Sequence, residues 1–312
     1  MGQWTVTQTA HPDHARSDAP AALGLLLDVD GPIASPVSRT VAIPSILGDL
    51  VLLAASGVPI AFITGRSDAF IRDEVITPLL SAGLGEALSL PGTRMFGVFE
   101  KGAAWAPVTS AGLGEIVVDE SVALPAAVVD EIRALVAAEY ADTMFFDETK
   151  RAMISVEQRM DVDREAYLPE QERFNAAAFA VVERHGLGVR LGDREAPDAS
   201  GRVPFRLDPT IISTDIESVL LDKDRGAERT LEYFAAGGPL PRVWRSVGDS
   251  RSDYLMADHL HSAGYEVAHV DVRPRDGILE RDYNVVTEGE LIHDEAGAAF
   301  LEHWVRTLGL RD

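Results

Sequence analysis

The segment that most constrains the fold is Leu23–Gly31, which reads LGLLLDVDG. An apolar run within it ends abruptly in two carboxylates, Asp28 and Asp30, and a glycine. An uninterrupted apolar run bounded by turn residues is typical of a strand buried on both faces of a parallel sheet. Ligands of such sheets bind beyond the carboxyl ends of the strands, and buried carboxylates need partners. The two acids therefore indicate a site rather than a packing position.

Composition narrows the class of protein. The chain has 312 residues, of which 46% are hydrophobic and 25% charged, which is enough for a globular core in one large domain or two. Its net charge of −22 argues against a nucleic acid or an anionic membrane as partner, because either would require clustered Lys and Arg. The oligomeric state stays open.

The cellular compartment is predicted from what the sequence lacks. There is no cysteine, which excludes disulfides and thiolate chemistry and fits a reducing cytoplasm. No apolar run reaches the roughly 18–20 residues of a membrane span, and the N-terminus lacks a secretory pattern. We therefore expect a cytoplasmic protein, with a flexible polar tail over residues 1–20.

Strands and helices are predicted to alternate in two parts of the chain. In the first part, a turn-rich loop at 31–40 precedes a helix over 41–56, a strand over 58–63 and a helix over 68–80. In the second part, helices are expected at 226–236, 254–263 and 300–308, with strands at 242–247 and 265–270. This order predicts an α/β fold with a Rossmann-like parallel sheet and right-handed crossovers.

The chain between these parts has a different texture. Short strands are expected around 96–105, 143–157 and 210–220, helices over 125–140 and 164–185, and a turn-rich segment over 189–205. This pattern favours an α+β insertion. We therefore expect a core of residues 21–99 and 213–312 and a second domain of residues 100–212.

Four separated segments place polar residues at the end of an apolar run or the start of a helix. They contain Asp28 and Asp30, then Thr64, Gly65 and Arg66, then Lys223, and finally Asp249 and Asp253. Each alone has an ordinary explanation, such as a helix N-cap or a solvated side chain. Together, in this order and in strand-then-helix contexts, they are far more specific.

These segments resemble the motifs of the haloacid dehalogenase superfamily of phosphohydrolases. The matching stretches are DVDG, the Thr of FITGR, the Lys of LLDKDRGAERTL, and GDSRSD. The insertion resembles the large cap of the sugar-phosphatase branch, which includes trehalose-phosphate and sucrose-phosphate phosphatases. The layout agrees over the whole chain beyond the tail, although only the four motifs are specific.

The resemblance implies a role for each acid. Asp28 would attack phosphorus as the nucleophile, and Asp30 would act as general acid and base. Mg²⁺ prefers oxygen ligands. It would be bound by the side chains of Asp28 and Asp249 and by the backbone carbonyl of Asp30, with Asp253 as a further ligand or a partner behind them. An acid at position 30 favours phosphoryl transfer over dehalogenation.

The resemblance also implies that Thr64, Gly65 and Lys223 hold the phosphate oxygens. Arg66 either joins them or pairs with an acid of the core. Two departures from the family pattern concern the loop of the two acids and the phosphate-binding cation. Pro32 replaces the usual Thr after DxDG and lacks an N–H. Two residues separate Lys223 from its glycine, so either Lys223 or Arg225 could meet the phosphate, with Lys223 favoured.

Substrate selection is expected to depend on the cap. In the related sugar phosphatases, polar residues of the cap sheet bind the sugar, and the candidates here are Glu148, Lys150, Glu157 and Arg159. The predicted function is a Mg²⁺-dependent phosphatase acting on a small phosphorylated metabolite, in particular a sugar phosphate. The alternatives are a phosphomutase of the same fold and a catalytically weak protein that binds phosphorylated metabolites.

Overall fold

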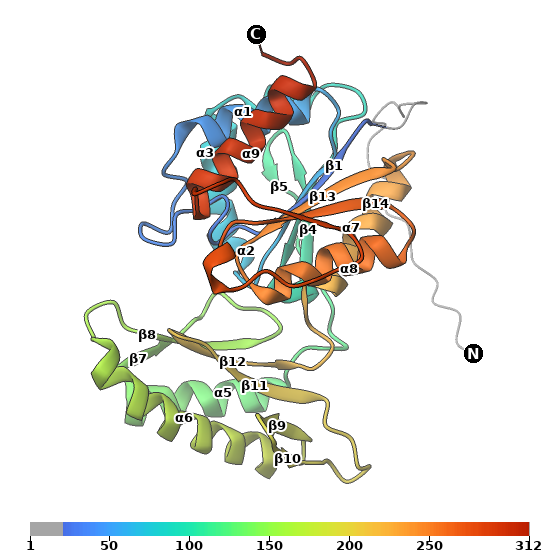
Figure 1. Ribbon diagram of the computed structural model, residues 1–312. Coiled ribbons are helices and arrows are strands. Elements are labelled where there is room, and N and C mark those ends of the chain that lie inside the picture. Colours follow the sequence, from blue (N-terminus) through green and yellow to red (C-terminus); the bar gives the residue numbers. More distant parts are fainter. Residues whose placement is uncertain (1–20, 312) are drawn as a thin grey trace.

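The computed structural model of the chain describes residues 21–311, so the tail predicted for residues 1–20 lies outside the described part. Within residues 21–311 the strands form two sheets, one above the other in Figure 1. No helix in this range combines the length and the apolar character that crossing a membrane requires. The predicted α/β class is confirmed.

The first sheet contains the strand that ends in Asp28. Its first six strands are parallel, and β4 and β5 then run antiparallel to their neighbours. In spatial order the strands are β15 (Asn284–Val286), β14 (Glu266–Asp271), β13 (Val243–Gly248), β1 (Gly24–Leu27), β2 (Ile60–Ile63), β3 (Met95–Phe99), β4 (Ala104–Thr109) and β5 (Gly112–Leu113), with β6 (Val117–Val118) also paired to β4.

Helices cover both faces of this sheet, which explains why β1 is apolar throughout. Leu25 and Leu27 belong to one buried cluster and Leu26 to the other, because successive strand residues point to opposite faces. One cluster is covered by α1 (Pro44–Ala55), α2 (Asp68–Ile71), η1 (Arg72–Ile76), α3 (Thr77–Ser81), α4 (Leu84–Ala87) and α9 (His293–Thr307). The other is covered by α7 (Lys223–Gly237) and α8 (Tyr254–Ser262).

The second sheet has helices on one face only, and we call this sheet with its helices the cap. Its strands, in spatial order, are β10 (Arg194–Ala196), β9 (Val189–Leu191), β11 (Phe205–Pro209), β12 (Ser213–Ser218), β8 (Ile154–Gln158) and β7 (Met144–Phe146). Helices α5 (Ala126–Leu135), extended by η3 (Val136–Tyr140), and α6 (Arg164–Arg184) lie on the side away from the first sheet (Figure 1). Ile154 and Val156 pack toward these helices. The alternate residues of the sheet therefore face the rest of the molecule, which we call the core.

Three boundaries differ from the sequence predictions. The insertion was expected to span 100–212, but β4, β5 and β6 extend the first sheet, and β12 pairs with cap strands. Antiparallel pairing with β3 places β4 in the core. The sequence pattern predicts that a segment is a strand but not which other strand it pairs with. Helix α9 begins at His293 rather than Phe300, because its first turns are polar and contain a glycine, so they lack an apolar stripe.

Candidate active site

Asp28 lies at the carboxyl end of the central strand β1. Its backbone N–H donates to the carbonyl of Val247 on β13, and its side chain is buried. Gly31 then turns the chain with φ at 97°, and a Cβ at this residue would lie 2.8 Å from the carboxyl carbon of Asp249. The glycine therefore permits the loops that follow β1 and β13 to approach each other closely.

Lys223 connects the acids at this edge of the sheet. It is the first residue of α7, and its side chain is buried. Its Nζ lies 2.6 Å from Oδ1 of Asp28, 2.8 Å from Oδ1 of Asp253 and 2.7 Å from the carbonyl oxygen of Ile63. Arg225 points elsewhere and pairs with Asp119. Of the two candidate cations, Lys223 is the one that reaches Asp28.

Three carboxylates converge beside this lysine. One oxygen from each of Asp28, Asp249 and Asp253 lies within 4.8 Å of the other two. Burial, reinforced by repulsion from Asp253, raises the pKa of Asp28, and the same two causes raise the pKa of Asp249 to about 7. Although burial opposes it, the ion pair with Lys223 lowers the pKa of Asp253. The cluster carries more negative charge than one lysine offsets.

Asp253 also orders the loop that presents Asp249. Its Oδ2 accepts hydrogen bonds from the backbone N–H of Asp249 at 3.1 Å and of Ser250 at 2.9 Å, and from the Ser250 hydroxyl. These hydrogen bonds form an N-terminal capping box for the short helix η4 (Arg251–Asp253), which leads into α8. Both oxygens of Asp253 are therefore engaged, which favours a supporting position over a primary metal ligand.

Asp30 is held by Arg66. The guanidinium donates from Nε to both carboxylate oxygens, at 3.1 and 3.0 Å, and from Nη2 to Oδ1 at 2.9 Å. Of the two alternatives that the sequence left for Arg66, the structure shows pairing with an acid of the core. Nη1 of the same arginine lies 3.8 Å from Glu157 on the cap, so Arg66 links the position of the cap to Asp30.

Thr64 and Gly65 form the loop after β2, next to Lys223. Thr64 is fully buried, and its hydroxyl oxygen accepts the N–H of Arg66 at 3.0 Å. Its backbone carbonyl accepts the N–H of Lys101 at 3.0 Å. The carbonyl of Gly65 accepts a hydrogen bond of 2.6 Å from Lys150 of the cap. The predicted phosphate loop thus lies directly under the cap.

The four predicted cap residues fall into two groups. Lys150 and Glu157 reach the core, and Glu157 lies between Arg66 and Arg39, 3.8 Å from each. Burial raises the pKa of Glu157. Glu148 and Arg159 do not reach the core, because Glu148 pairs with Arg133 of α5 and Arg159 with Asp161, all on the exposed side. The prediction for these two residues is corrected, since the hairpin turns their side chains away.

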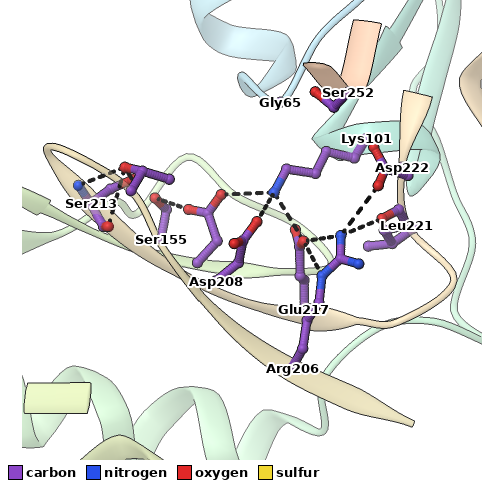
Figure 2. A network of polar contacts seen from close by, with 12 residues as sticks. Gly65, Lys101, Ser155, Arg206, Asp208, Ser213, Glu217, Leu221, Asp222 and Ser252 are labelled. Carbon is purple, nitrogen blue, oxygen red and sulfur yellow. Dashed lines mark hydrogen bonds and ion pairs between the residues drawn. The ribbon is translucent and has the colours of Figure 1, made fainter. Parts of the chain in front are cut away.

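A second lysine cluster at the site was missed by the sequence analysis. Lys101 extends from the core to the cap sheet, where its Nζ lies 2.9 Å from Glu217, 3.2 Å from Asp215 and 3.3 Å from Asp208 (Figure 2). Arg206 donates to the same Glu217 oxygen at 2.7 Å. The available signal was the alternation of Asp215 and Glu217 along a strand, which places both on one face.

The neighbouring residue Glu100 joins the core to the cap through the backbone. It is fully buried, and its carboxylate accepts the N–H groups of Arg151 at 2.8 Å, Ala152 at 2.9 Å and Met153 at 3.1 Å. Glu100 and Lys101 both have positive φ, 50° and 55°, which non-glycine residues rarely adopt. Strained backbone of this kind persists only where the surroundings enforce it.

Comparisons with known proteins find likeness in structure. No family model matches the chain, and no curated protein matches it in sequence. The C-terminal domain of Candida albicans trehalose-6-phosphate phosphatase superposes with a TM-score of 0.60 at 12% identity, covering 90% of this chain and 91% of that one. A haloacid dehalogenase-like hydrolase from Bacteroides thetaiotaomicron gives 0.55 at 12% identity, covering 91% and 100%.

A third structure agrees with these two. Trehalose-6-phosphate phosphatase from Aspergillus fumigatus gives a TM-score of 0.50 at 14% identity, over 92% of this chain and 93% of that one. Likeness at such low identity establishes the arrangement of core and cap and leaves the reaction to be argued from the site. The chain has the fold of a haloacid dehalogenase-like hydrolase.

Proposed function

We propose that the protein is a Mg²⁺-dependent phosphatase that hydrolyses a small phosphorylated metabolite, a sugar phosphate in particular, through an aspartyl-phosphate. The observation that carries the proposal is the convergence of Asp28, Lys223, Asp249 and Asp253 at one edge of the sheet. These residues come from three segments far apart in the chain. A buried nucleophile, a cation and paired acids meet there as phosphoryl transfer requires.

The chain's own residues supply both half-reactions. A carboxylate oxygen of Asp28 forms a bond to phosphorus while the bond to the ester oxygen breaks, and Asp30 gives its proton to that leaving oxygen. A water then attacks phosphorus and gives its proton to Asp30. The bond from phosphorus to Asp28 breaks and inorganic phosphate leaves. Lys223 and the loop of Thr64 and Gly65 stabilise the charge on the phosphoryl oxygens.

The donor set fits Mg²⁺. Three carboxylate groups offer oxygen atoms within 4.8 Å of one another, which suits a hard cation that takes one or two carboxylates and keeps several waters. Asp28 and Asp249 would hold the ion, with Asp253 behind them. When bound, the metal would offset the repulsion between Asp28 and the incoming phosphate.

The composition of the cap surface favours a polar substrate that is rich in hydroxyl groups. Its face toward the core carries acids and bases instead of an apolar lining, including Glu157, Asp215, Glu217 and Arg206. Such side chains suit sugar hydroxyls better than a lipid or an aromatic group. Contacts such as Lys150 with Gly65 and Thr149 with Ser67 have to break when the cap admits a substrate.

The test is a panel of phosphate esters with Mg²⁺, assayed for inorganic phosphate and for rearranged ester. We expect phosphate release that Asp28→Asn lowers by roughly 10⁴-fold or more. The matched control is Asp161→Asn, which changes the same side chain on the exposed side of the cap. Full activity in Asp28→Asn refutes the nucleophile. An isomeric sugar phosphate indicates a mutase, and binding without turnover of any ester indicates a sensor.

A further inference from the structure

His293 opens helix α9 with its backbone in the left-handed region, at φ 52°. Its N–H donates to the carbonyl of Val272, just after β14, at 2.8 Å. Few non-glycine residues adopt this conformation, although histidine does so more often than most, and a glycine there would adopt it without strain. Non-glycine strain of this kind is found preferentially at functional sites. The position of His293 therefore calls for an explanation beyond helix formation.

The start of α9 is fixed against the loop of Asp28 and Asp30. Gly297 lies one turn after His293, and a Cβ at this residue would lie 1.9 Å from the carbonyl oxygen of Pro32. The helix thus touches the loop that follows the two acids, with no room for any side chain. Together with the hydrogen bond to Val272, this contact fixes the backbone of His293 relative to the loop of the two acids.

The imidazole faces Asp249. Its Nδ1 lies 3.8 Å from Oδ2 of Asp249, is buried from solvent, and has no hydrogen-bond partner among residues 21–311. A separation of 3.8 Å is too long for a hydrogen bond but within reach of one after a small shift. Arg273 approaches the same oxygen to 4.0 Å and is itself paired with Asp276. His293 is therefore the neighbour of Asp249 that has a buried ring nitrogen still to be satisfied.

We propose that His293 is a positioning residue of the metal centre, whose Nδ1–H restrains the carboxylate of Asp249 through Oδ2 so that this carboxylate is oriented for the cation. The inference rests on the metal site of the proposed function. Groups that hydrogen-bond to a metal-ligating carboxylate orient it for the ion, and their loss typically lowers metal affinity 10- to 100-fold. The strained backbone keeps the ring beside Asp249.

The test distinguishes the effect of the His293 imidazole from the effect of the strained backbone at this position. Mn²⁺, as a spectroscopic probe, is titrated into the full-length protein and followed by electron paramagnetic resonance, with thermal unfolding measured on the metal-free samples. His293→Gly removes the ring and relieves the left-handed strain. We expect this variant to unfold at an equal or higher temperature and to bind Mn²⁺ about tenfold more weakly.

Two further variants complete the set. His293→Asn tolerates the left-handed backbone and retains an N–H donor, so we expect it to regain part of the lost affinity. His303→Ala removes an exposed histidine of the same helix and should bind Mn²⁺ like the wild type. Mn²⁺ affinity unchanged in His293→Gly overturns the proposal, as does a wild type that binds no Mn²⁺. Weakened Mn²⁺ binding in a protein that hydrolyses no ester supports the role of His293 and counts only against the phosphatase.

Discussion

Two clusters of the molecule are built alike, with one lysine among carboxylates, and they differ in what surrounds them. Lys223 and its partners Asp28 and Asp253 expose 6%, 8% and 0% of their side chains. Lys101, which Figure 2 shows among its partners, exposes 16% of its side chain, and its partners Asp208, Asp215 and Glu217 expose 46%, 13% and 0%. The first cluster lies within the core, at the edge of one sheet, whereas the second spans two parts of the molecule. The first cluster is therefore held within one part of the molecule, whereas the second depends on contact between the cap and the core.

The largest difference is expected when each lysine is removed. Lys223→Met leaves Asp28 and Asp253 buried without a counter-charge, so we expect it to lower the free energy of unfolding by about 3–5 kcal/mol. Lys101→Met should cost less, about 1–2 kcal/mol. Arg206 still pairs with Glu217, the Ser155 hydroxyl still donates to Asp215, and Asp208 is exposed to water. Urea unfolding of both variants measures this. Equal losses would show that the two clusters do not differ as proposed.

An intermediate effect is expected from pH. Burial lowers the pKa of His269, whose Nδ1 lies 2.8 Å from the Ser246 hydroxyl, to about 4. Because this value is below the ordinary 6.5, the unfolded chain binds the proton more readily and stability falls as the pH drops from 6.5 toward 4. Between pH 7 and 5.5 this histidine alone should remove about 1 kcal/mol.

The measurement compares how steeply the free energy of unfolding changes with pH, rather than its absolute value. This is needed because the raised pKa values of Asp28 and Asp249 make stability increase as the pH falls, opposite to the effect of His269. Stability is followed from pH 7 to 5.5 in the wild type, in His269→Gln and in Lys101→Met. We expect a shallower loss in His269→Gln, because the buried imidazole is gone. Lys101→Met should also show a shallower loss, because burial then raises the pKa of Glu217 without the opposing effect of the lysine. An altered slope in Lys101→Met alone would place the sensitive group at the cap.

The smallest effect concerns cap closure. Losing the contacts of Lys101 with the cap acids should favour an open arrangement of the cap and raise KM about fivefold. The value of kcat should stay within about threefold, because the proposed chemistry takes place at the other cluster. The control is Arg194→Met, which removes a charge stacked on Phe179 of α6, on the helix-covered side of the cap. A collapse of kcat in Lys101→Met would mean that Lys101 acts on the phosphoryl group itself.

The same contrast explains what the sequence could predict. Asp28 of the first cluster and its neighbours Thr64 and Asp249 each follow an apolar strand, so the sequence placed these three residues at one edge of a parallel sheet. Lys101 and His293 reach the site through left-handed backbone. This conformation of non-glycine residues leaves no periodic signal. The orientation of Glu148 and Arg159 depended on a hairpin whose turn the pattern of strands does not fix.

The three amides held by Glu100 have a consequence for how the cap moves. A carboxylate that grips consecutive backbone groups resists sliding of the cap across the core but tolerates a swing about that point. The separation between cap and core would then increase most on the side of the site farthest from Glu100. The size of the phosphate esters that can enter the site would then depend on how far the cap rotates, as well as on the side chains that line the site.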